Sequence, residues 1–457
     1  MLECYFLFAI VLLSALISFV SNDKIAKFST IASSLISIIL SILIWNIKPL
    51  ISGWLYIDAL SKIMIATITI IYFTTSLFSI SYFEHVKKPL LKKNLYWAFM
   101  NLFVLSMLFS VAVGNLGFVW VGIEATTITS ALLVAIDNNY PSIEASWRYI
   151  IIVSVGLIAS LVGIIFIYAQ TKTLNIPYMI NHHINPSSIM LIGSAMTIIG
   201  FGTKAGIFPM HTWLPDVHGR SIAPVSAIFS SVLLPSAIFG IIRVLQISNS
   251  YEINRFVFSL GVLTVMFAAL FIVNQQYYKR MFAYSSIENM GVILIGISLG
   301  KYGILGAIIL LISHAFAKSS AFYLTGNILS VYKSRKIREI NSLTTRMPYT
   351  GYGLMLASLA VTGAPPFATF IGEFLILSGI LKVYGVSYAV IVLSFLLLAF
   401  ISLNYKVAQM SFSKKEGFNQ ASCEFIGATI PIINIVLSFC VLFAIPLISN
   451  VLKGFVL

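Results

Sequence analysis

The sequence predicts an all-α protein that crosses a membrane many times. Of its 457 residues, 59% are hydrophobic and only 9% are charged, and the mean hydropathy is +0.99. Apolar runs long enough to cross about 30 Å of hydrocarbon recur along the whole chain. A soluble core cannot bury this much apolar surface, so we expect a polytopic membrane protein rather than a water-soluble enzyme.

The apolar runs predict about fourteen membrane-spanning helices. The expected ranges are 2–20, 28–45, 62–82, 97–113, 116–136, 148–169, 189–209, 221–246, 256–274, 281–299, 303–329, 351–380, 386–408 and 425–449. The first run has no basic segment and no small-residue cleavage site, so we interpret it as a first span rather than a cleaved signal peptide.

The segments between these runs exclude several kinds of active site. None is long enough for a soluble catalytic domain, and neither a GxxxxGK[ST] phosphate loop nor an HExxH metal motif occurs. The three cysteines, Cys4, Cys423 and Cys440, are too scattered for an iron–sulfur cluster or a disulfide framework. We therefore expect no cofactor, no metal and no electron-transfer site in this chain.

The basic residues predict the orientation. They lie in short loops rather than in one patch, which favours membrane topology over nucleic-acid binding. Seven lie on one side of the predicted membrane, and Lys204, Arg243 and Lys318 lie within spans. The other side carries eighteen: Lys24, Lys27, Lys87, Lys88, Lys92, Lys93, Arg148, Arg220, Lys279, Arg280, Lys333, Arg335, Lys336, Arg338, Arg346, Lys406, Lys414 and Lys415. By the positive-inside rule this side is cytoplasmic, which puts both termini outside a cell membrane.

A lysine near the middle of the 189–209 span is the first candidate functional residue. A charge at that depth costs several kcal/mol, so Lys204 requires an internal partner or an aqueous cavity. Pro209 removes a backbone donor shortly after it and predicts a broken helix lining a hydrated site. His211 and His218 follow the break as accessory candidates.

Glu124 is the expected partner of Lys204. It lies in the middle of the 116–136 span, where an unpaired carboxylate would take up a proton. We expect Glu124 and Lys204 to form an ion pair whose strength depends on neighbouring charges.

A histidine and a lysine share one face of the 303–329 span. His314 precedes Lys318 by four residues, which is one helical turn. A histidine titrates near neutral pH, and desolvation lowers the pKa of a lysine toward that range, so both groups can exchange protons. A buried polar pair used for helix packing is the alternative. Glu288, near a helix end, fits a relay and a partner contact equally well. Arg243 is expected to reach an interface rather than carry protons.

Glu373 repeats the arrangement in the second half of the chain. It follows Pro365 and Pro366, which predict a second broken helix. The recurrence predicts two inverted five-helix repeats, each containing a broken helix. The expected divisions are an N-terminal three-helix segment (1–96), the first repeat (97–250), the second repeat (251–410) and a C-terminal helix (411–457).

The residues around these sites resemble a known family. Glu124, the run from Gly202 to His218, the segment from His314 to Lys318, and Gly372-Glu373 resemble the antiporter-like proton-channel subunits of respiratory complex I, of group 4 hydrogenases and of Mrp antiporters. Tyr284-Ser-Ser-Ile-Glu288 is similar to the hydrogenase-4 and formate hydrogenlyase branch. The resemblance implies a fourteen-helix fold and a mid-membrane proton axis of Glu124, Lys204, His314, Lys318 and Glu373.

Two positions depart from the family pattern. Pro235 stands where some relatives carry a lysine in the eighth helix, so the central step rests on Lys318 and His314. Asn289 stands where the hydrogenase-like pattern often has histidine, which weakens a titrating role at that turn.

The predicted function is proton translocation in a redox-driven respiratory complex, either complex I-like (NADH dehydrogenase) or an energy-converting hydrogenase. The expected partners are other antiporter-like and small membrane subunits, a peripheral redox module, the lipid bilayer and protons, without nucleic acid. A subunit of a Mrp-type sodium/proton antiporter without a redox partner is the alternative. Pro235 motivates a third hypothesis, an assembly scaffold that no longer transports.

Overall fold

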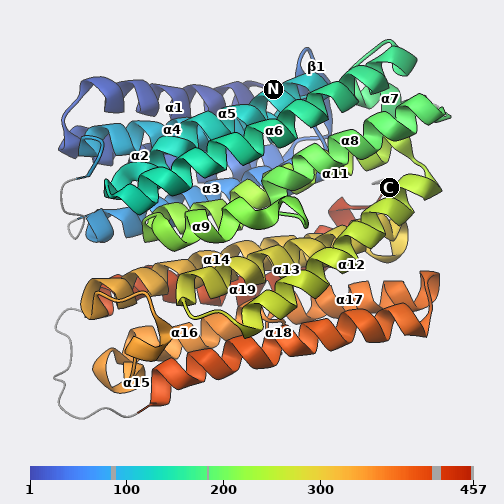
Figure 1. Ribbon diagram of the computed structural model, residues 1–457. Helices are drawn as coiled ribbons and strands as arrows, with labels where there is room; N and C mark the ends of the chain where they lie inside the picture. Colours follow the sequence, from blue (N-terminus) through green and yellow to red (C-terminus); the bar gives the residue numbers. More distant parts are fainter. Residues whose placement is uncertain (84–88, 183–184, 414–423, 454–457) are drawn as a thin grey trace.

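The computed structural model describes residues 1–83, 89–182, 185–413 and 424–453, and the side chains of 424–426 are not described. Lys87, Lys88, Lys414, Lys415 and Cys423, which entered the charge and cysteine arguments above, lie outside these ranges. Within the described chain, helices dominate and run nearly parallel or antiparallel to one another (Figure 1). The predicted all-α membrane fold is therefore confirmed.

In the first half of the bundle, most of the predicted spans are single unbroken helices. Its helices are α1 (Leu2–Val20), α2 (Asp23–Asn46), α3 (Ala59–Tyr82), α4 (Lys93–Ala112), α5 (Leu116–Val134), α6 (Tyr140–Thr171), α7 (Ile176–Asn181), α8 (Ser188–Ala205), α9 (Trp213–Arg220), α10 (Ala223–Ile228) and α11 (Leu234–Ser248). A π-helical segment, η4 (Phe229–Leu233), joins α10 to α11 into one continuous span.

The second half of the chain contains the remaining described helices. They are α12 (Tyr251–Val273), α13 (Tyr278–Ser298), α14 (Ile304–Tyr332), α15 (Leu343–Arg346), α16 (Pro348–Val361), α17 (Ala368–Val383), α18 (Val386–Phe412) and α19 (Glu424–Val451). In the described residues, 13 helical segments are long and apolar enough to span a membrane. The remaining predicted span, 351–380, consists of α16 and α17, each too short to cross alone.

Both predicted helix breaks are present, but the first begins earlier than expected. The α8 helix ends at Ala205, because Gly206 takes a left-handed conformation with φ of 76° that only glycine adopts without strain. Pro209 lies in the irregular segment that follows. Lys204 is therefore in the last turn of α8 rather than near its middle. The second break, between Val361 and Ala368, contains Pro365 and Pro366 as predicted.

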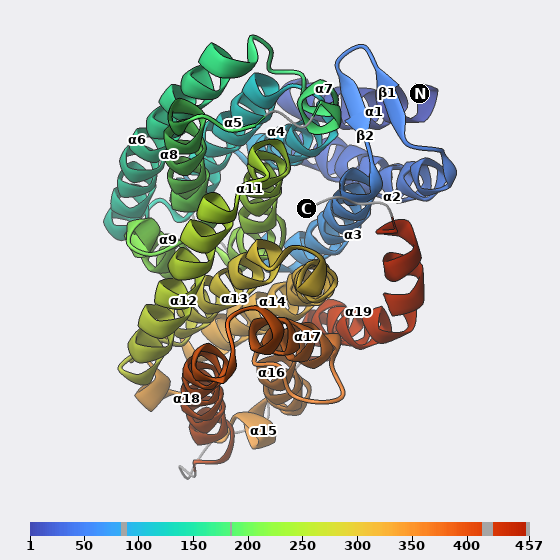
Figure 2. The ribbon, with the colours of Figure 1, turned by 90° about the vertical axis from the view of Figure 1, so that its right-hand side faces the viewer.

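Three spans form the centre of the molecule. The α10–η4–α11 span and α13 are buried throughout, and α14 is buried over most of its length. Viewed along the helices, α11, α13 and α14 occupy the middle, whereas α1, α2, α6, α18 and α19 lie at the periphery (Figure 2). The peripheral helices expose large apolar side chains such as Leu13, Ile158 and Phe443, as a surface in contact with lipid requires.

Loops from distant parts of the sequence meet at the two ends of the bundle. At one end, Leu90 N donates to Ile136 O, Arg335 pairs with Asp137, and Tyr277 forms a β-bridge with Lys336. We call this the basic end, because Lys92, Lys279, Arg280, Lys333 and Arg335 are among its residues.

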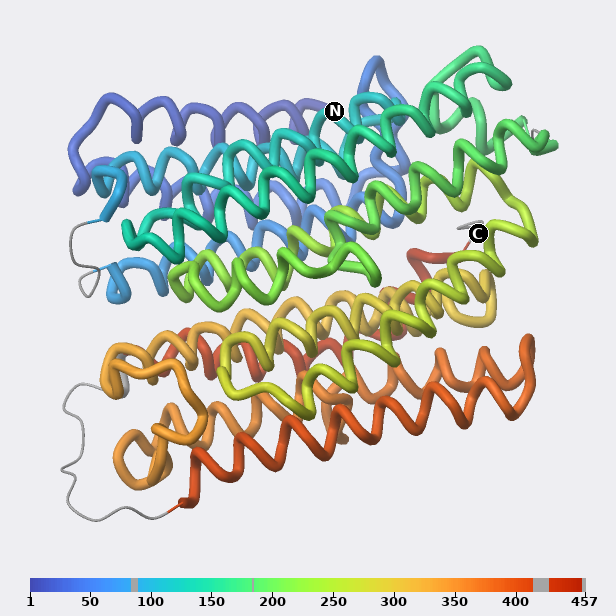
Figure 3. Tube along the Cα trace, in the orientation of Figure 1, coloured from blue at the N-terminus to red at the C-terminus, as the bar shows by residue number. Residues whose placement is uncertain are grey.

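The opposite end is closed by short extended segments. Gly114 N donates to Trp54 O and Leu116 N donates to Leu174 O. A two-stranded hairpin, β1 (Leu50–Ser52) with β2 (Leu55–Ile57), lies here and was not predicted. The tube trace in Figure 3 follows the chain between the two ends.

Glycines let two pairs of helices cross closely. A Cβ added at Gly200 of α8 would lie 2.5 Å from Ser160 Cβ of α6, and one at Gly156 would lie 2.5 Å from Thr203 Cβ. On α14 and α17, a Cβ at Gly306 would lie 2.7 Å from the carbonyl oxygen of Gly372. Such contacts between small residues bring backbones together in membrane bundles. These contacts place Lys204 and Glu373 on tightly packed helices.

The inverted repeat and the division of the chain into four segments stay predictions.

Candidate functional site

Lys204 is completely buried and is held by two neutral hydroxyl groups. Its Nζ donates to Thr127 Oγ1 of α5 at 2.8 Å and to the Tyr149 hydroxyl of α6 at 2.5 Å. Tyr149 is linked onward to Ser130, with 2.8 Å between the two hydroxyl oxygens. Three helices therefore converge on one ammonium group, and the close α6–α8 crossing brings Tyr149 within its reach.

Glu124 does not form the predicted direct ion pair with Lys204. Ion pairs within 4 Å exist elsewhere in the described chain, but not between these two residues. Instead, Ser154 donates to Glu124 Oε1 at 3.0 Å, and the buried Oε2 has no hydrogen-bond partner. Thr127, one helical turn after Glu124, occupies the position next to the ammonium. The carboxylate still lies close enough to attract Lys204 electrostatically.

The break after α8 is stabilised by an indole group. Trp213 Nε1 donates to Thr203 O at 2.8 Å, a carbonyl at the end of α8 that also accepts a longer bond of 3.3 Å from the capping Gly206 N. The indole also packs against the Tyr149 ring, with 4.8 Å between ring centroids. The broken segment thus supports the same tyrosine that accepts from Lys204.

Lys318 lies on α14 and is also completely buried. Its Nζ donates to Phe282 O at 2.9 Å and to Ser285 Oγ at 2.5 Å, both on α13. His314 lies one turn before it on α14 as predicted, but no hydrogen bond joins the two side chains. Both ring nitrogens of His314 are buried without a hydrogen-bond partner. The lysine is therefore held by α13 rather than by the neighbouring histidine.

Glu288 lies one turn after Ser285 on α13. Its side chain is buried, its Oε2 has no hydrogen-bond partner, and it is close enough to interact electrostatically with both Lys318 and Glu373. The next residue, Asn289, donates to Val361 O at 3.2 Å and so connects α13 to the second helix break. Glu288 is placed between the central lysine and the last carboxylate rather than at a helix end.

Glu373 lies against the second helix break. A Cβ added at Gly363 would overlap the Glu373 carboxylate, and Gly363 has a φ of 66°. No hydrogen bond or ion pair to Glu373 is found among the described residues. The carboxylate therefore occupies space that exists only because residue 363 is glycine.

The two accessory histidines occupy different surroundings. His211, in the broken segment, packs against Phe208 and Phe271, and its Nδ1 has no hydrogen-bond partner. His218, on α9, is fully buried with both ring nitrogens unpartnered, and it stacks on Phe322 of α14 at 4.7 Å between centroids. His218 therefore faces the helix that carries Lys318.

The eighth span, α10–η4–α11, has Pro235 where some relatives carry a lysine, so it has no titratable side chain at that position. Its arginine, Arg243, is in an ion pair. Arg243 does not reach an interface as predicted: it is fully buried and makes two 2.7 Å hydrogen bonds to the Asp58 carboxylate. A planar guanidinium matches a carboxylate in this bidentate way. Arg243 thus fastens α11 to the start of α3.

Sequence reasoning missed the hydroxyl groups that hold the two lysines. Thr127 lies three residues after Glu124, and Ser285 lies three residues before Glu288, so helical spacing from each glutamate could have identified both. Tyr149 lies on another helix and has no such local signal. Hydroxyl groups therefore lie beside both buried lysines in the row of ionisable groups formed by Glu124, Lys204, Lys318, Glu288 and Glu373.

Comparisons with known proteins agree with this arrangement. Residues 113–402 match the family described as "NADH:quinone oxidoreductase/Mrp antiporter, TM". The hydrogenase-4 component F homolog of Methylacidiphilum infernorum is 31% identical over 422 residues, which cover 88% of this chain and 88% of that protein.

Two solved structures have similar folds. One is a chain of the membrane-bound sulfane sulfur reductase, an archaeal respiratory membrane complex (TM-score 0.89, 24% identity, covering 99% of this chain and 96% of that one). The other is a chain of the Mrp complex from Dietzia sp. DQ12-45-1b (TM-score 0.88, 17% identity, covering 99% and 96%). The fold is therefore shared by a respiratory complex and an antiporter complex.

Proposed function

Because the chain belongs to the family of NADH:quinone oxidoreductase and Mrp antiporter transmembrane subunits, we propose that it translocates protons as a membrane subunit of a redox-driven respiratory complex. The complex is either complex I-like or an energy-converting hydrogenase. The similarity to a hydrogenase-4 component F homolog, which covers 88% of both chains, supports the hydrogenase type.

One observation carries this proposal: ionisable side chains lie at and between the two helix breaks, and of these Lys204 and Lys318 are completely buried while Glu373 is partly exposed. Lys204 lies at the first break, Lys318 in the central α14, and Glu373 at the second. Burying such charges in a membrane costs free energy, so ionisable groups inside membrane spans are rare unless they have a function. Glu124 at the start of the row and Glu288 near its end complete the series.

The hydrogen bonds indicate how the row responds to a change of charge. Each lysine donates its hydrogen bonds to neutral acceptors. A glutamate lies about one helical turn from one of these acceptors, so it attracts the ammonium electrostatically without forming a direct ion pair. When a neighbouring charge changes, the balance between proton retention and release at Lys204 or Lys318 shifts. Moving one charge against 100 mV costs about 2.3 kcal/mol, so transport requires an external driver.

The driver lies in other chains under this proposal. The partners are other antiporter-like and small membrane subunits together with a peripheral redox module. The basic end faces the cytoplasm of a cell by the positive-inside rule, which places both termini outside. Protons then cross from the basic end to the opposite end.

Replacing Lys204 tests the proposal in the assembled complex. In proteoliposomes containing the purified complex, Lys204→Ala lowers the number of protons moved per electron, whereas electron transfer continues. Lys172→Ala, at an exposed residue that ends α6 at the opposite end, serves as the matched control. An unchanged proton-to-electron ratio in Lys204→Ala would contradict the assigned role.

The alternative, a Mrp-type sodium/proton antiporter subunit, is favoured by one observation. The fold matches a Mrp complex chain about as closely as it matches the respiratory one. Purification of the native complex separates the two functions: co-purifying redox subunits support the first. Antiport that depends on a sodium gradient, without any electron donor, supports the second.

A further inference from the structure

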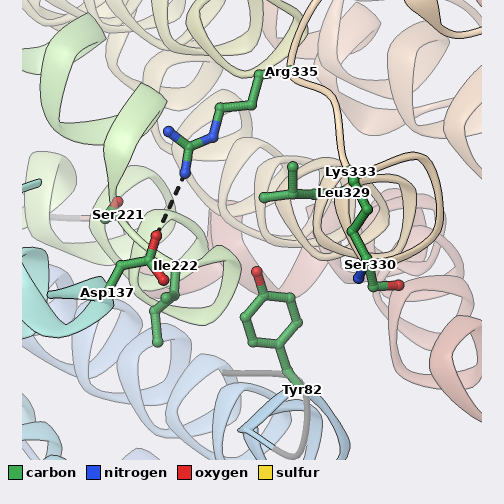
Figure 4. A pocket seen from close by; sticks show the side chains of 8 residues that line it. All are labelled: Tyr82, Asp137, Ser221, Ile222, Leu329, Ser330, Lys333 and Arg335. Atoms are coloured by element: carbon green, nitrogen blue, oxygen red, sulfur yellow. Dashed lines mark hydrogen bonds and ion pairs between the residues drawn. The ribbon is translucent and has the colours of Figure 1, made fainter. Parts of the chain in front are cut away.

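A pocket opens between the two halves of the chain at the basic end. Its volume is about 180 Å³, and Figure 4 shows the residues that line it. They come from the ends of α3 and α14, the loop between α9 and α10, the turn after α5 and the loop after α14. Asp137 and Arg335 form an ion pair at 3.5 Å on one side, and the Tyr82 hydroxyl points toward the middle. Lys333 and Ser330 line the other side. Most of the residues that line this pocket are polar or charged, although helices of the apolar bundle surround it.

A buried lysine adjoins the pocket. Lys279, only 2% exposed, donates from Nζ to Ser221 O at 2.8 Å, and Ser221 lines the pocket. Lys279 also lines a second hollow of about 100 Å³ that shares Arg335 with the first. Lys279 is close enough to interact electrostatically with both Asp137 and Arg335. A charged group therefore lies between two openings at the basic end.

His218 lies deeper in the bundle than the pocket and is connected to it through two serines. The Ser221 and Ser226 hydroxyl oxygens lie 2.8 Å apart, and Ser226 Oγ donates to His218 O at 3.3 Å. The His218 ring stacks on Phe322, one turn after Lys318, and is close enough to interact electrostatically with both Lys279 and Lys318. The imidazole thus lies between the pocket residues and the central lysine.

The His218 ring nitrogens are the observation that points to proton transfer. A neutral imidazole has one donor and one acceptor nitrogen, and neither has a partner among the described residues although both are buried. Leaving buried polar atoms unpaired is unfavourable, so a packing role alone does not account for this histidine. Buried polar atoms of this kind bind water where there is room for it, and a bound water can join an imidazole to its neighbours.

We propose that this pocket is the inlet through which protons from the basic end reach Lys318, by way of Asp137, Lys279 and His218. The inference rests on the proposed proton-translocating function and describes the route by which protons enter the protein. His218 takes a proton on one ring nitrogen and releases one from the other, so the ring carries no net charge after each transfer. Lys318 receives the proton as its own passes along the row.

The first test replaces the imidazole without removing its stacking. His218→Phe keeps an aromatic ring against Phe322 but has no nitrogen. In proteoliposomes containing the purified complex, we expect proton translocation per electron to fall to the level of a Lys318→Ala complex. His182→Phe is the matched control, because His182 also stacks on an aromatic ring, Tyr178, but is exposed at the opposite end.

A second test avoids changes to the buried core. In a variant in which Cys4, Cys423 and Cys440 are replaced by serine, Ser330→Cys places a thiol in the pocket, and a membrane-impermeant cationic thiol reagent is added to the side of the basic end. Labelling after assembly is expected to block translocation while electron transfer continues. Thr173→Cys, in a surface hollow at the opposite end, is the control.

The outcomes separate this inference from the proposed function. If Lys318→Ala abolishes this subunit's share of translocation but His218→Phe and labelled Ser330→Cys do not, the inlet is wrong and the function stands. If Lys318→Ala itself leaves translocation unchanged, the proposed function fails. Should His218→Phe prevent assembly, the labelling result alone decides, since it is obtained on the folded complex.

Discussion

The Lys204 ammonium donates a 2.5 Å hydrogen bond to the Tyr149 hydroxyl, and this tyrosine, not Glu124, is in direct contact with the buried charge. A hydrogen bond to a charged group contributes about 1.5–3 kcal/mol, so the phenol stabilises the protonated lysine substantially. Tyr149 is therefore part of the proposed proton path although nothing in its local sequence indicates it.

Tyr149→Phe tests this contact. Loss of the hydroxyl removes about 1.5–3 kcal/mol of stabilisation from the ammonium, which corresponds to a roughly tenfold or larger shift toward the neutral lysine. We expect slower proton translocation by the assembled complex with normal electron transfer. The control is Tyr168→Phe, the same change at an exposed position near the other end of α6. Equal rates in the two variants would show that the hydroxyl is not needed.

Ser285→Ala tests the corresponding contact of the second lysine. Lys318 would keep only Phe282 O as a hydrogen-bond acceptor among its described partners, so its ammonium is destabilised and Glu288 becomes its main source of attraction. We expect a transport defect that Glu288→Gln deepens more than additively, measured as a double-mutant cycle. Ser298→Ala, at a buried serine that bonds only to Ile295 O of its own helix, is the control. Purely additive losses of transport would show that Glu288 does not interact with Lys318.

Gly200→Ala tests the α6–α8 crossing. Alanine usually stabilises a helix relative to glycine, by about 0.4–1 kcal/mol, but here its Cβ would lie 2.4 Å from Gly156 O without room to move. We expect a lower thermal unfolding midpoint in detergent and weaker translocation, because α8 carries Lys204. Gly353→Ala, where the nearest atom is a Leu324 methyl group at 3.3 Å, should cause neither effect.

Gly363→Ala tests the space that Glu373 occupies. The new Cβ collides with the carboxylate and also adopts a left-handed conformation, which costs about 1–2 kcal/mol for a non-glycine residue. In a Glu373→Ala background only the backbone cost remains. The unfolding midpoint should therefore fall less when Gly363→Ala is introduced into Glu373→Ala than into the native chain. The same decrease in both backgrounds would mean that the carboxylate lies elsewhere.

The sequence predicts the spans, both helix breaks and the helices that carry Lys318 and Glu373, because these features depend on strong local signals. The same signals put Lys204 near the middle of its span, whereas it lies in the last turn of α8. Long apolar runs, proline and an isolated charge are each visible without knowing the fold. Where local signals compete, prediction is less accurate. Gly206 ends α8 before Pro209, and α6 begins eight residues early, at Tyr140, because Asn139 caps it through the backbone N of Ser142.

The partners of the charged groups are not visible in the sequence because they depend on tertiary packing. Thr127, Tyr149 and Ser285 are ordinary residues of apolar spans until two other helices place a lysine beside them. The same reason explains Arg243. Its partner, Asp58, precedes it by 185 positions. The local sequence shows only that Arg243 lies near the end of a span, which suggests contact with an interface instead.

Breaking the buried Asp58–Arg243 pair is expected to lower the stability of the fold strongly. Removing one partner leaves the other charge buried alone, which costs about 3–5 kcal/mol, whereas removing both charges costs much less. Asp58→Asn and Arg243→Met should each lower the unfolding midpoint strongly, and the double variant should recover most of the loss. Asn keeps the acceptor that caps α3 at Ser61 N. Glu339→Gln, in an exposed ion pair with Lys336, is the control and should change nothing measurable.

The contribution of this pair also depends on pH. Burial would raise the pKa of the Asp58 carboxyl, but Arg243 and the hydrogen bonds from Ser61 outweigh burial and hold this pKa below its ordinary value of 3.8. A carboxyl whose pKa is lower in the folded state stabilises the fold fully above the unfolded pKa. This stabilisation is lost as the pH falls through the folded value. The difference in unfolding midpoint between the native protein and the double variant should therefore be constant from pH 7 to about pH 5 and change below about pH 4, in favour of the variant. A difference that stays constant below pH 4 would mean that Asp58 is not ionised in the folded protein.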